Sequence, residues 1–160
     1  MRPALPMMFL LLAACATTPL AEVGAAGPDT ISLETGPCFG TCPVYRVTVS
    51  ADGSGSFEGR RFTAVTGTRR FEVTPDQYRA FARHLAPLRP TSAERRYSGE
   101  ACTMMATDLP STEVSWAEGG TSRTLYFYHG CDMEKNWAIA ERLNAAPALL
   151  PIGDLVRPPD

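Results

Sequence analysis

The chain has 160 residues, a formal net charge of -2 and a pI near 5.7. This length provides one compact domain with a buried core and is too short for a second. A slightly acidic chain lacks the clustered excess of Lys and Arg that nucleic-acid recognition usually shows, so we expect no nucleic-acid partner.

The first residues have the pattern of a secretory signal. Met1-Arg2 precede an apolar run that is too short for a transmembrane helix, and this run ends in Leu12-Ala13-Ala14-Cys15. The ending resembles the bacterial lipobox, in which the cysteine is lipidated and becomes the first residue of the mature chain. The sequence therefore predicts a lipoprotein signal peptide over residues 1–14 and lipidation of Cys15. The alternative is an ordinary secretory signal with an incidental cysteine.

The lipobox resemblance also implies a location. Several acyl chains on Cys15 would anchor the protein stably, because one chain alone binds a membrane only marginally. Ala16 follows the cysteine in place of the aspartate that retains such proteins at the inner membrane, so we expect the outer membrane, facing the periplasm. Residues 15–29 are rich in Ala, Thr, Gly and Pro and show no period, which predicts a flexible tether.

Residues 30–157 are expected to form a single domain that begins with a run of strands. Alternating apolar and polar residues predict strands over 31–34, 45–50, 55–62 and 69–73. Asp52-Gly53 marks the tight turn of the first hairpin. The helix start Thr74-Pro75-Asp76-Gln77 combines a threonine cap with a glutamine that completes a capping box. The helix then presents one apolar stripe: Tyr78, Phe81, Ala82 and Leu85.

The second half of the domain is less regular. Residues 88–109 are predicted to form a long surface loop, and Ser111–Trp116 with Thr121–Tyr128 form a second hairpin. Asp132 is expected to cap a last helix with the buried stripe Met133, Trp137, Ala140 and Leu143. The tail 149–156 is expected to be an extended edge. Together these elements predict an α+β fold with a mostly antiparallel sheet packed by two helices on one face.

The cysteines predict disulfide bonds. Once Cys15 is assigned to lipid, an even number remains in an oxidising compartment, and three connectivities are possible. We favour Cys38 with Cys42, because Gly40 allows a tight loop, and Cys102 with Cys131, which ties the irregular segment to the second hairpin.

Two other chemistries use the same residues. Cys38 and Cys42 could form a redox dithiol, although their spacing is one residue longer than C-x-x-C and a strand follows. Cys102, His129 and Cys131 could hold zinc, although the oxidising compartment argues against it.

A hydrolase is a further alternative. Its triad would be drawn from Ser98 or Ser111, His129 and Asp108, but no G-x-S-x-G motif supports it. We expect no metal or cofactor, and a non-catalytic protein is favoured over an enzyme.

Four segments carry a family resemblance: Pro37-Cys38-Phe39-Gly40-Thr41-Cys42-Pro43-Val44-Tyr45, Asp52-Gly53, Thr107-Asp108-Leu109-Pro110 and Tyr128-His129-Gly130-Cys131. Together they resemble a bacterial envelope family known as domain of unknown function 6438, over residues 31–145. The resemblance implies a small secreted or lipid-anchored domain and brings no established activity or catalytic residue.

These observations favour an outer-membrane lipoprotein that serves as a binding or structural module of the envelope. Its partners would be the membrane, through the lipid, and a protein or cell-wall component. Tyr126, Tyr128 and His129 are the candidates for an exposed contact face, because aromatic side chains supply binding area at low entropic cost. The alternative is a thiol-redox or metal-binding protein.

Overall fold

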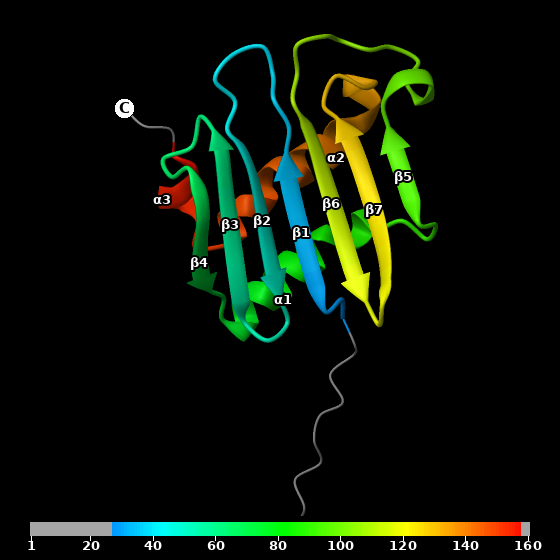
Figure 1. The fold of residues 1–160 in the computed structure, drawn as a ribbon. Coiled ribbons are helices and arrows are strands. Elements are labelled where there is room, and N and C mark those ends of the chain that lie inside the picture. Colours follow the sequence, from blue (N-terminus) through cyan, green and yellow to red (C-terminus); the bar gives the residue numbers. More distant parts are fainter. Residues whose placement is uncertain (1–26, 158–160) are drawn as a thin grey trace, which may run out of the picture.

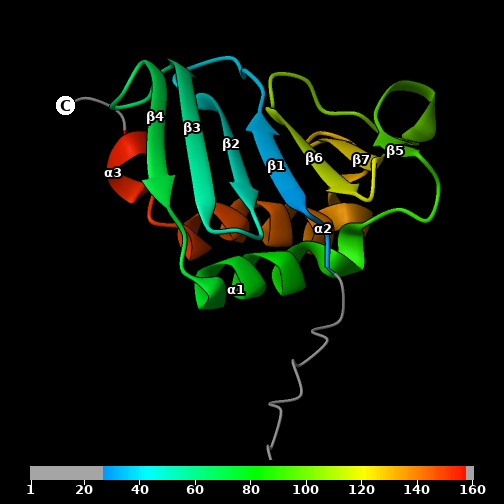
Figure 2. The same cartoon turned by 60° about the horizontal axis from the view of Figure 1, so that its bottom comes forward.

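The computed structural model describes residues 27–157. The expected signal peptide, the lipidation residue Cys15 and most of the expected tether lie outside these residues. The described part of the chain forms an α+β domain in which helices cover one face of one sheet (Figure 1, Figure 2).

The sheet has seven strands in the order β4-β3-β2-β1-β6-β7-β5. All neighbouring strands are antiparallel except β5 and β7, which are parallel. The strands are β1 (Thr30–Thr35), β2 (Val44–Ser50), β3 (Ser54–Arg61), β4 (Gly67–Glu72), β5 (Glu94–Tyr97), β6 (Ser111–Glu118) and β7 (Thr121–Tyr128). The two predicted hairpins are therefore present, and the first strand of the domain lies between them at the centre of the sheet.

The inner face of the sheet holds the core. Ile31 on β1 lies opposite Val49 on β2 and Trp116 on β6, and all three side chains are buried. Every second residue of these strands points inward, as the alternation in the sequence predicts. The outer face is polar, and no helix of residues 27–157 lies over it, which is the usual state of an antiparallel sheet covered on one side (Figure 2).

Helix α1 (Pro75–Leu85) forms as the sequence predicts. The Thr74 hydroxyl accepts a hydrogen bond from the Gln77 amide at 3.2 Å, and the Gln77 side chain accepts one from the Thr74 amide at 2.9 Å. The capping box thus satisfies two orphan amides of the helix start, and Pro75 at the first helical position has no amide to satisfy. Phe81 and Leu85 are fully buried against the sheet.

Helix α2 (Met133–Ala145) covers the same face, and half of the predicted stripe is correct: Leu143 is buried and Ala140 packs against the core, but Met133 and Trp137 are exposed. Met133 is 52% exposed and Trp137 is 58% exposed, whereas Asn136 and Leu143 are buried. The Asn136 amide nitrogen donates to the Cys131 carbonyl oxygen at 2.9 Å, so a polar residue can face inward here. The hydrogen bond and the buried leucine fix the rotation of the helix about its axis.

Two other segments differ from the predictions. The loop expected over residues 88–109 contains the strand β5, which is rich in charge and shows no apolar alternation. The tail is not an extended edge, because it forms a 3₁₀ turn over Ala146–Leu149 and the short helix α3 (Gly153–Val156). Leu150 and Ile152 lie between these turns and are buried in the core.

Candidate functional site

Three connections meet at one end of the sheet, which we call the disulfide end and define as residues 36–43, 99–110 and 129–133 (Figure 1). The Phe39 amide donates to the Asp108 carbonyl oxygen at 3.1 Å, and the His129 amide donates to the Pro110 carbonyl oxygen at 3.0 Å. The fold therefore brings together three of the four segments that carry the family resemblance. The fourth, Asp52-Gly53, lies in the β2–β3 turn at the other end.

Both disulfides lie at this end. Cys38 is bonded to Cys42, with 5.8 Å between Cα atoms, and Cys102 is bonded to Cys131, with 5.2 Å between Cα atoms. These are the two pairs that the sequence analysis favoured. Because a bridged cysteine offers no thiolate, Cys102 and Cys131 do not form the zinc site considered with His129. Within residues 27–157, no three His, Cys, Asp or Glu side chains gather to hold a metal ion.

Gly130 allows the connections to approach closely. A Cβ atom at this position would lie 2.1 Å from the Ala106 carbonyl oxygen, which is too short for any side chain. The Ala106 amide donates to the Gly130 carbonyl oxygen at 2.9 Å, and Met105 forms an antiparallel bridge with Cys131. The glycine in Tyr128-His129-Gly130-Cys131 therefore has a packing reason, since it lets two backbones touch.

The side chain of Asp132 links the start of α2 to the segment that contains Thr103 and Met104. This residue precedes α2, but its carboxylate does not cap that helix as the sequence predicted. The carboxylate instead accepts hydrogen bonds from the Met104 amide at 2.7 Å and the Thr103 amide at 3.1 Å. These bonds lower the pKa of Asp132, the Met104 amide contributing most. The backbone of Asp132 is left-handed, with φ of 41°, and its side chain reaches the amides of Thr103 and Met104.

The three residues proposed as a contact face do not share one face of the sheet. Tyr126 and Tyr128 are half-buried on the outer face, where the Arg96 guanidinium lies 4.1 Å from the centroid of the Tyr126 ring. His129 lies against the inner side, edge-on to buried Phe127, with ring centroids 5.0 Å apart. The structure therefore places Tyr126 and Tyr128 on one side of the sheet and His129 on the other.

His129 and Asp108, two members of the hypothetical hydrolase triad, have different hydrogen-bond partners. A 2.9 Å hydrogen bond joins its Nε2 atom to the Thr112 hydroxyl, and burial lowers the pKa of the imidazole. Asp108 accepts a hydrogen bond from the neighbouring Thr107 hydroxyl at 3.1 Å. The histidine and the acid of the hypothetical triad are thus each engaged with a threonine.

A groove runs along the disulfide end, and we call it the methionine groove. It has a volume of about 520 Å³ and is lined by Met104, Met105, Ala106, Gly130, Met133 and Glu134. The exposed fractions of Met104, Met105 and Met133 are 67%, 54% and 52%. Sequence reasoning missed this groove because it assigned Met133 to the core and treated Met104 and Met105 as part of a loop.

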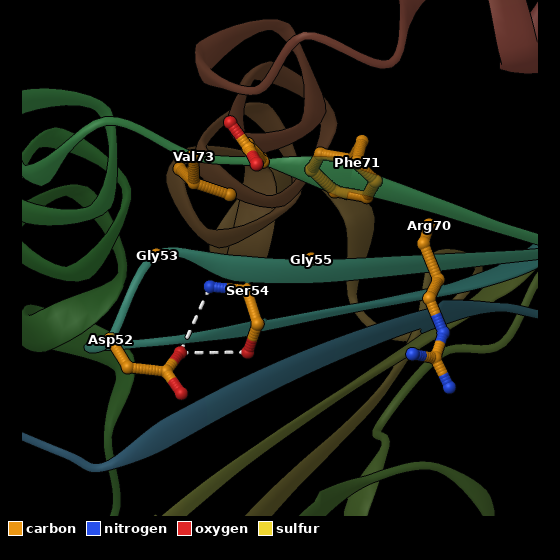
Figure 3. Close-up of a pocket in the computed structure, with 8 residues that line it drawn as sticks. Asp52, Gly53, Ser54, Gly55, Arg70, Phe71 and Val73 are labelled. Atoms are coloured by element: carbon orange, nitrogen blue, oxygen red, sulfur yellow. Dashed lines mark hydrogen bonds between the residues drawn. The ribbon is translucent and has the colours of Figure 1, made fainter.

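A second hollow lies at the opposite end of the sheet, where the β2–β3 turn meets the edge strand β4 (Figure 3). The Asp52 carboxylate there accepts hydrogen bonds from the Ser54 amide at 2.9 Å and the Ser54 hydroxyl at 2.7 Å. These bonds lower the pKa of Asp52, the Ser54 amide contributing most. The Asp52 carboxylate therefore stabilises the Asp52-Gly53 turn, and this structural role explains its hydrogen bonds without a bound ligand.

The fold and the site define a class: a small, disulfide-bonded α+β domain with one open sheet face and an apolar groove among its loops. The family described as "Domain of unknown function (DUF6438)" matches residues 29–146, and the chain belongs to this family. No curated protein matches the chain. Among residues 27–157, none of the helices has the length and apolar character needed to cross a membrane.

Proposed function

We propose that this protein is a lipid-anchored, non-catalytic binding module of the bacterial envelope that binds its partner at the disulfide end. The observation that carries the proposal is the exposure of large apolar side chains there. Phe39 is 88% exposed at the tip of the Cys38–Cys42 loop, in addition to the three methionines of the groove. Apolar side chains gathered on a rigid surface are typical of interaction sites.

The titratable groups of the disulfide end support a binding role over a catalytic one. The Asp132 carboxylate is hydrogen-bonded to backbone amides, and His129 is hydrogen-bonded to Thr112. All four cysteines at this end are joined in pairs. These groups hold the loops in place, and a preorganised surface loses less entropy when it binds.

The direction of the chain supports the proposed anchoring. The chain joins β1 at Asp29, whose amide donates to the Ala117 carbonyl oxygen at 2.7 Å beside the β6–β7 turn. That turn lies at the end of the sheet opposite the disulfide end (Figure 1). The residues between Cys15 and Asp29 can span at most about 50 Å. A chain anchored through Cys15 would therefore be tethered at the end of the domain opposite the groove.

Photo-crosslinking in intact cells tests the binding surface. With p-benzoylphenylalanine at position 39 or 105, we expect the same envelope partner to be captured from both positions. The matched control is position 76, because the Asp76 side chain is 91% exposed and lies at the start of α1, at the opposite end. Equal capture from position 76, or capture of abundant porins alone, would contradict the proposal.

The anchoring has its own test. Globomycin should cause the unprocessed precursor to accumulate, and Cys15→Ala should move the protein from the membrane fraction to the soluble fraction. Protein that stays membrane-bound after Cys15→Ala would show that lipid on this cysteine is not the anchor.

A second candidate function is thiol–disulfide exchange at Cys38–Cys42, favoured by the exposed loop that this bridge closes. The strand β2 follows the bridge, whereas a helix start would lower the pKa of a thiol. Steady reduction of insulin by the purified protein would support this candidate. We expect no turnover.

A further inference from the structure

All the methionines among residues 27–157 lie in the methionine groove. Methionine is usually a core residue that fills irregular gaps. The core of this domain contains none, because it is built from aliphatic and aromatic side chains. All three thioethers instead line the exposed methionine groove. Packing of the core does not explain this arrangement.

The fold fixes the backbone positions of these three methionines. Met104 and Met105 lie nearly thirty residues before Met133, and the backbones of their segments are joined directly. The Asp132 amide donates to the Met104 carbonyl oxygen at 2.9 Å, and the Cys102–Cys131 disulfide crosses the same pair of segments. A site whose ligands stand on a braced backbone is preorganised, so binding does not have to order the loops.

We propose that the methionine groove binds a soft monovalent metal ion, Cu(I), through the thioethers of Met104, Met105 and Met133. Neutral thioether sulfur suits the soft Cu(I) ion, whereas protein zinc sites use thiolate, imidazole and carboxylate ligands, and calcium and magnesium take oxygen ligands. This inference rests on the proposed function, because it assigns a metal-ion ligand to the same binding surface at the disulfide end.

The chemistry of the surrounding residues fits this ion. The cysteines of the disulfide end are bridged and offer no thiolate, so thioethers are the soft ligands that remain. Glu134 lines the groove, and Asp132 lines the adjoining hollow together with Met104 and Glu134. Lys135 offsets one of these two negative charges, which leaves a local field that favours a cation.

Titration of the full chain carrying Cys15→Ala with Ag(I) tests the proposal, because this substitution removes the one cysteine that lies outside the two disulfides and whose thiolate would compete for the ion. Ag(I) has the same charge and similar softness, and it needs no reductant, so the disulfides stay intact. We expect one saturable site by calorimetry in a chloride-free buffer, unaffected by excess Zn²⁺. The ε-methyl carbon signals of Met104, Met105 and Met133 should shift together in NMR spectra of methyl-labelled protein.

The decisive variant is Met104→Leu, Met105→Leu and Met133→Leu combined. Leucine keeps the volume and apolar character of methionine, so the domain should still fold. We expect at least a 100-fold loss of Ag(I) affinity. The matched control is Trp137→Leu, which changes another exposed apolar residue of α2 and should bind Ag(I) normally.

The outcomes separate this inference from the proposed function. Absence of saturable Ag(I) binding, or equal binding by the triple variant, overturns the metal site; residual binding would then belong to Met1, Met7, Met8 or other groups. If Ag(I) does not bind but the triple variant loses its photo-crosslinked partner, the groove takes an apolar protein segment. In that case the binding module stands and the metal inference fails.

Discussion

At the scale of single residues, Asp132 connects two segments of the disulfide end. Its left-handed backbone ends the turn after Cys131, and its carboxylate accepts hydrogen bonds from Thr103 and Met104. An ionised carboxylate makes these hydrogen bonds stronger than a neutral group would. One side chain thus links the start of α2 to the segment that carries two of the groove methionines.

This role predicts a specific pH dependence. The pKa of Asp132 is lowered in the folded state, so its ionised form stabilises the fold above about pH 4 and this stabilisation is lost as the pH falls through the folded pKa. In Asp132→Asn, the free energy of unfolding should fall less between pH 6 and pH 3 than in the wild type. Urea unfolding at several pH values measures this difference.

A second measurement checks the same bonds directly. Amide hydrogen exchange of Thr103 and Met104 should be faster in Asp132→Asn, because both amides lose a charged acceptor. If the free energy of unfolding had the same pH dependence in the wild type and in Asp132→Asn, and amide exchange were unchanged, the carboxylate would not hold this segment.

At the scale of elements, the two long helices differ in how much of them is encoded locally. Helix α1 has a capping box and one apolar stripe, so both its start and its buried face could be predicted. Helix α2 begins after a left-handed residue that does not cap it, and its inward face includes the polar Asn136. A sequence pattern could predict that α2 exists, but not which side of it is buried.

A pair of substitutions tests the observed rotation of α2. Leu143→Ala should destabilise the protein by about 2–5 kcal/mol, because it leaves a cavity in the core. Trp137→Gln should change stability by less than about 0.5 kcal/mol, because Trp137 is largely exposed. Chemical unfolding of both variants gives the comparison. A larger loss from Trp137→Gln than from Leu143→Ala would mean that the helix is rotated.

Strand β5, at the edge of the sheet, is another element that the sequence pattern did not predict. Its residues Glu94 to Tyr97 carry three charges and no alternation, so the sequence indicated a loop. The segment becomes a strand because β7 offers an open edge for parallel pairing, with Arg95 opposite Leu125 and Tyr97 opposite Phe127. Its charges also suit an edge position, since they discourage pairing with another chain.

At the scale of the whole molecule, the domain has two different ends. The chain enters at one, where the Tyr78 hydroxyl donates to the Pro28 carbonyl oxygen and Asp29 bonds the β6–β7 turn. The connections of the disulfide end lie at the other (Figure 1), and they carry both disulfides and the methionine groove. Such a polarity suits a protein that is anchored at one end and binds at the other.

The two disulfides should contribute unequally to stability. The Cys102–Cys131 bridge closes a sequence separation of 29 residues, and the Cys38–Cys42 bridge closes one of 4. In the chain-entropy model these loops correspond to about 3.6 and about 2 kcal/mol. Urea unfolding of the two paired Cys→Ser variants should therefore show the larger loss for Cys102→Ser with Cys131→Ser. The opposite order would show that the short bridge holds the disulfide end together.

The sequence by itself determined the features that neighbouring residues encode: the alternating strands of both hairpins, the capping box of α1, the even set of cysteines and the α+β class. Only the tertiary structure decided the pairing of β5, the rotation of α2 and the gathering of Met104, Met105 and Met133 in one groove. Periodicity depends on near neighbours along the chain. Burial and site geometry depend on what packs against each residue, and here those partners come from distant segments.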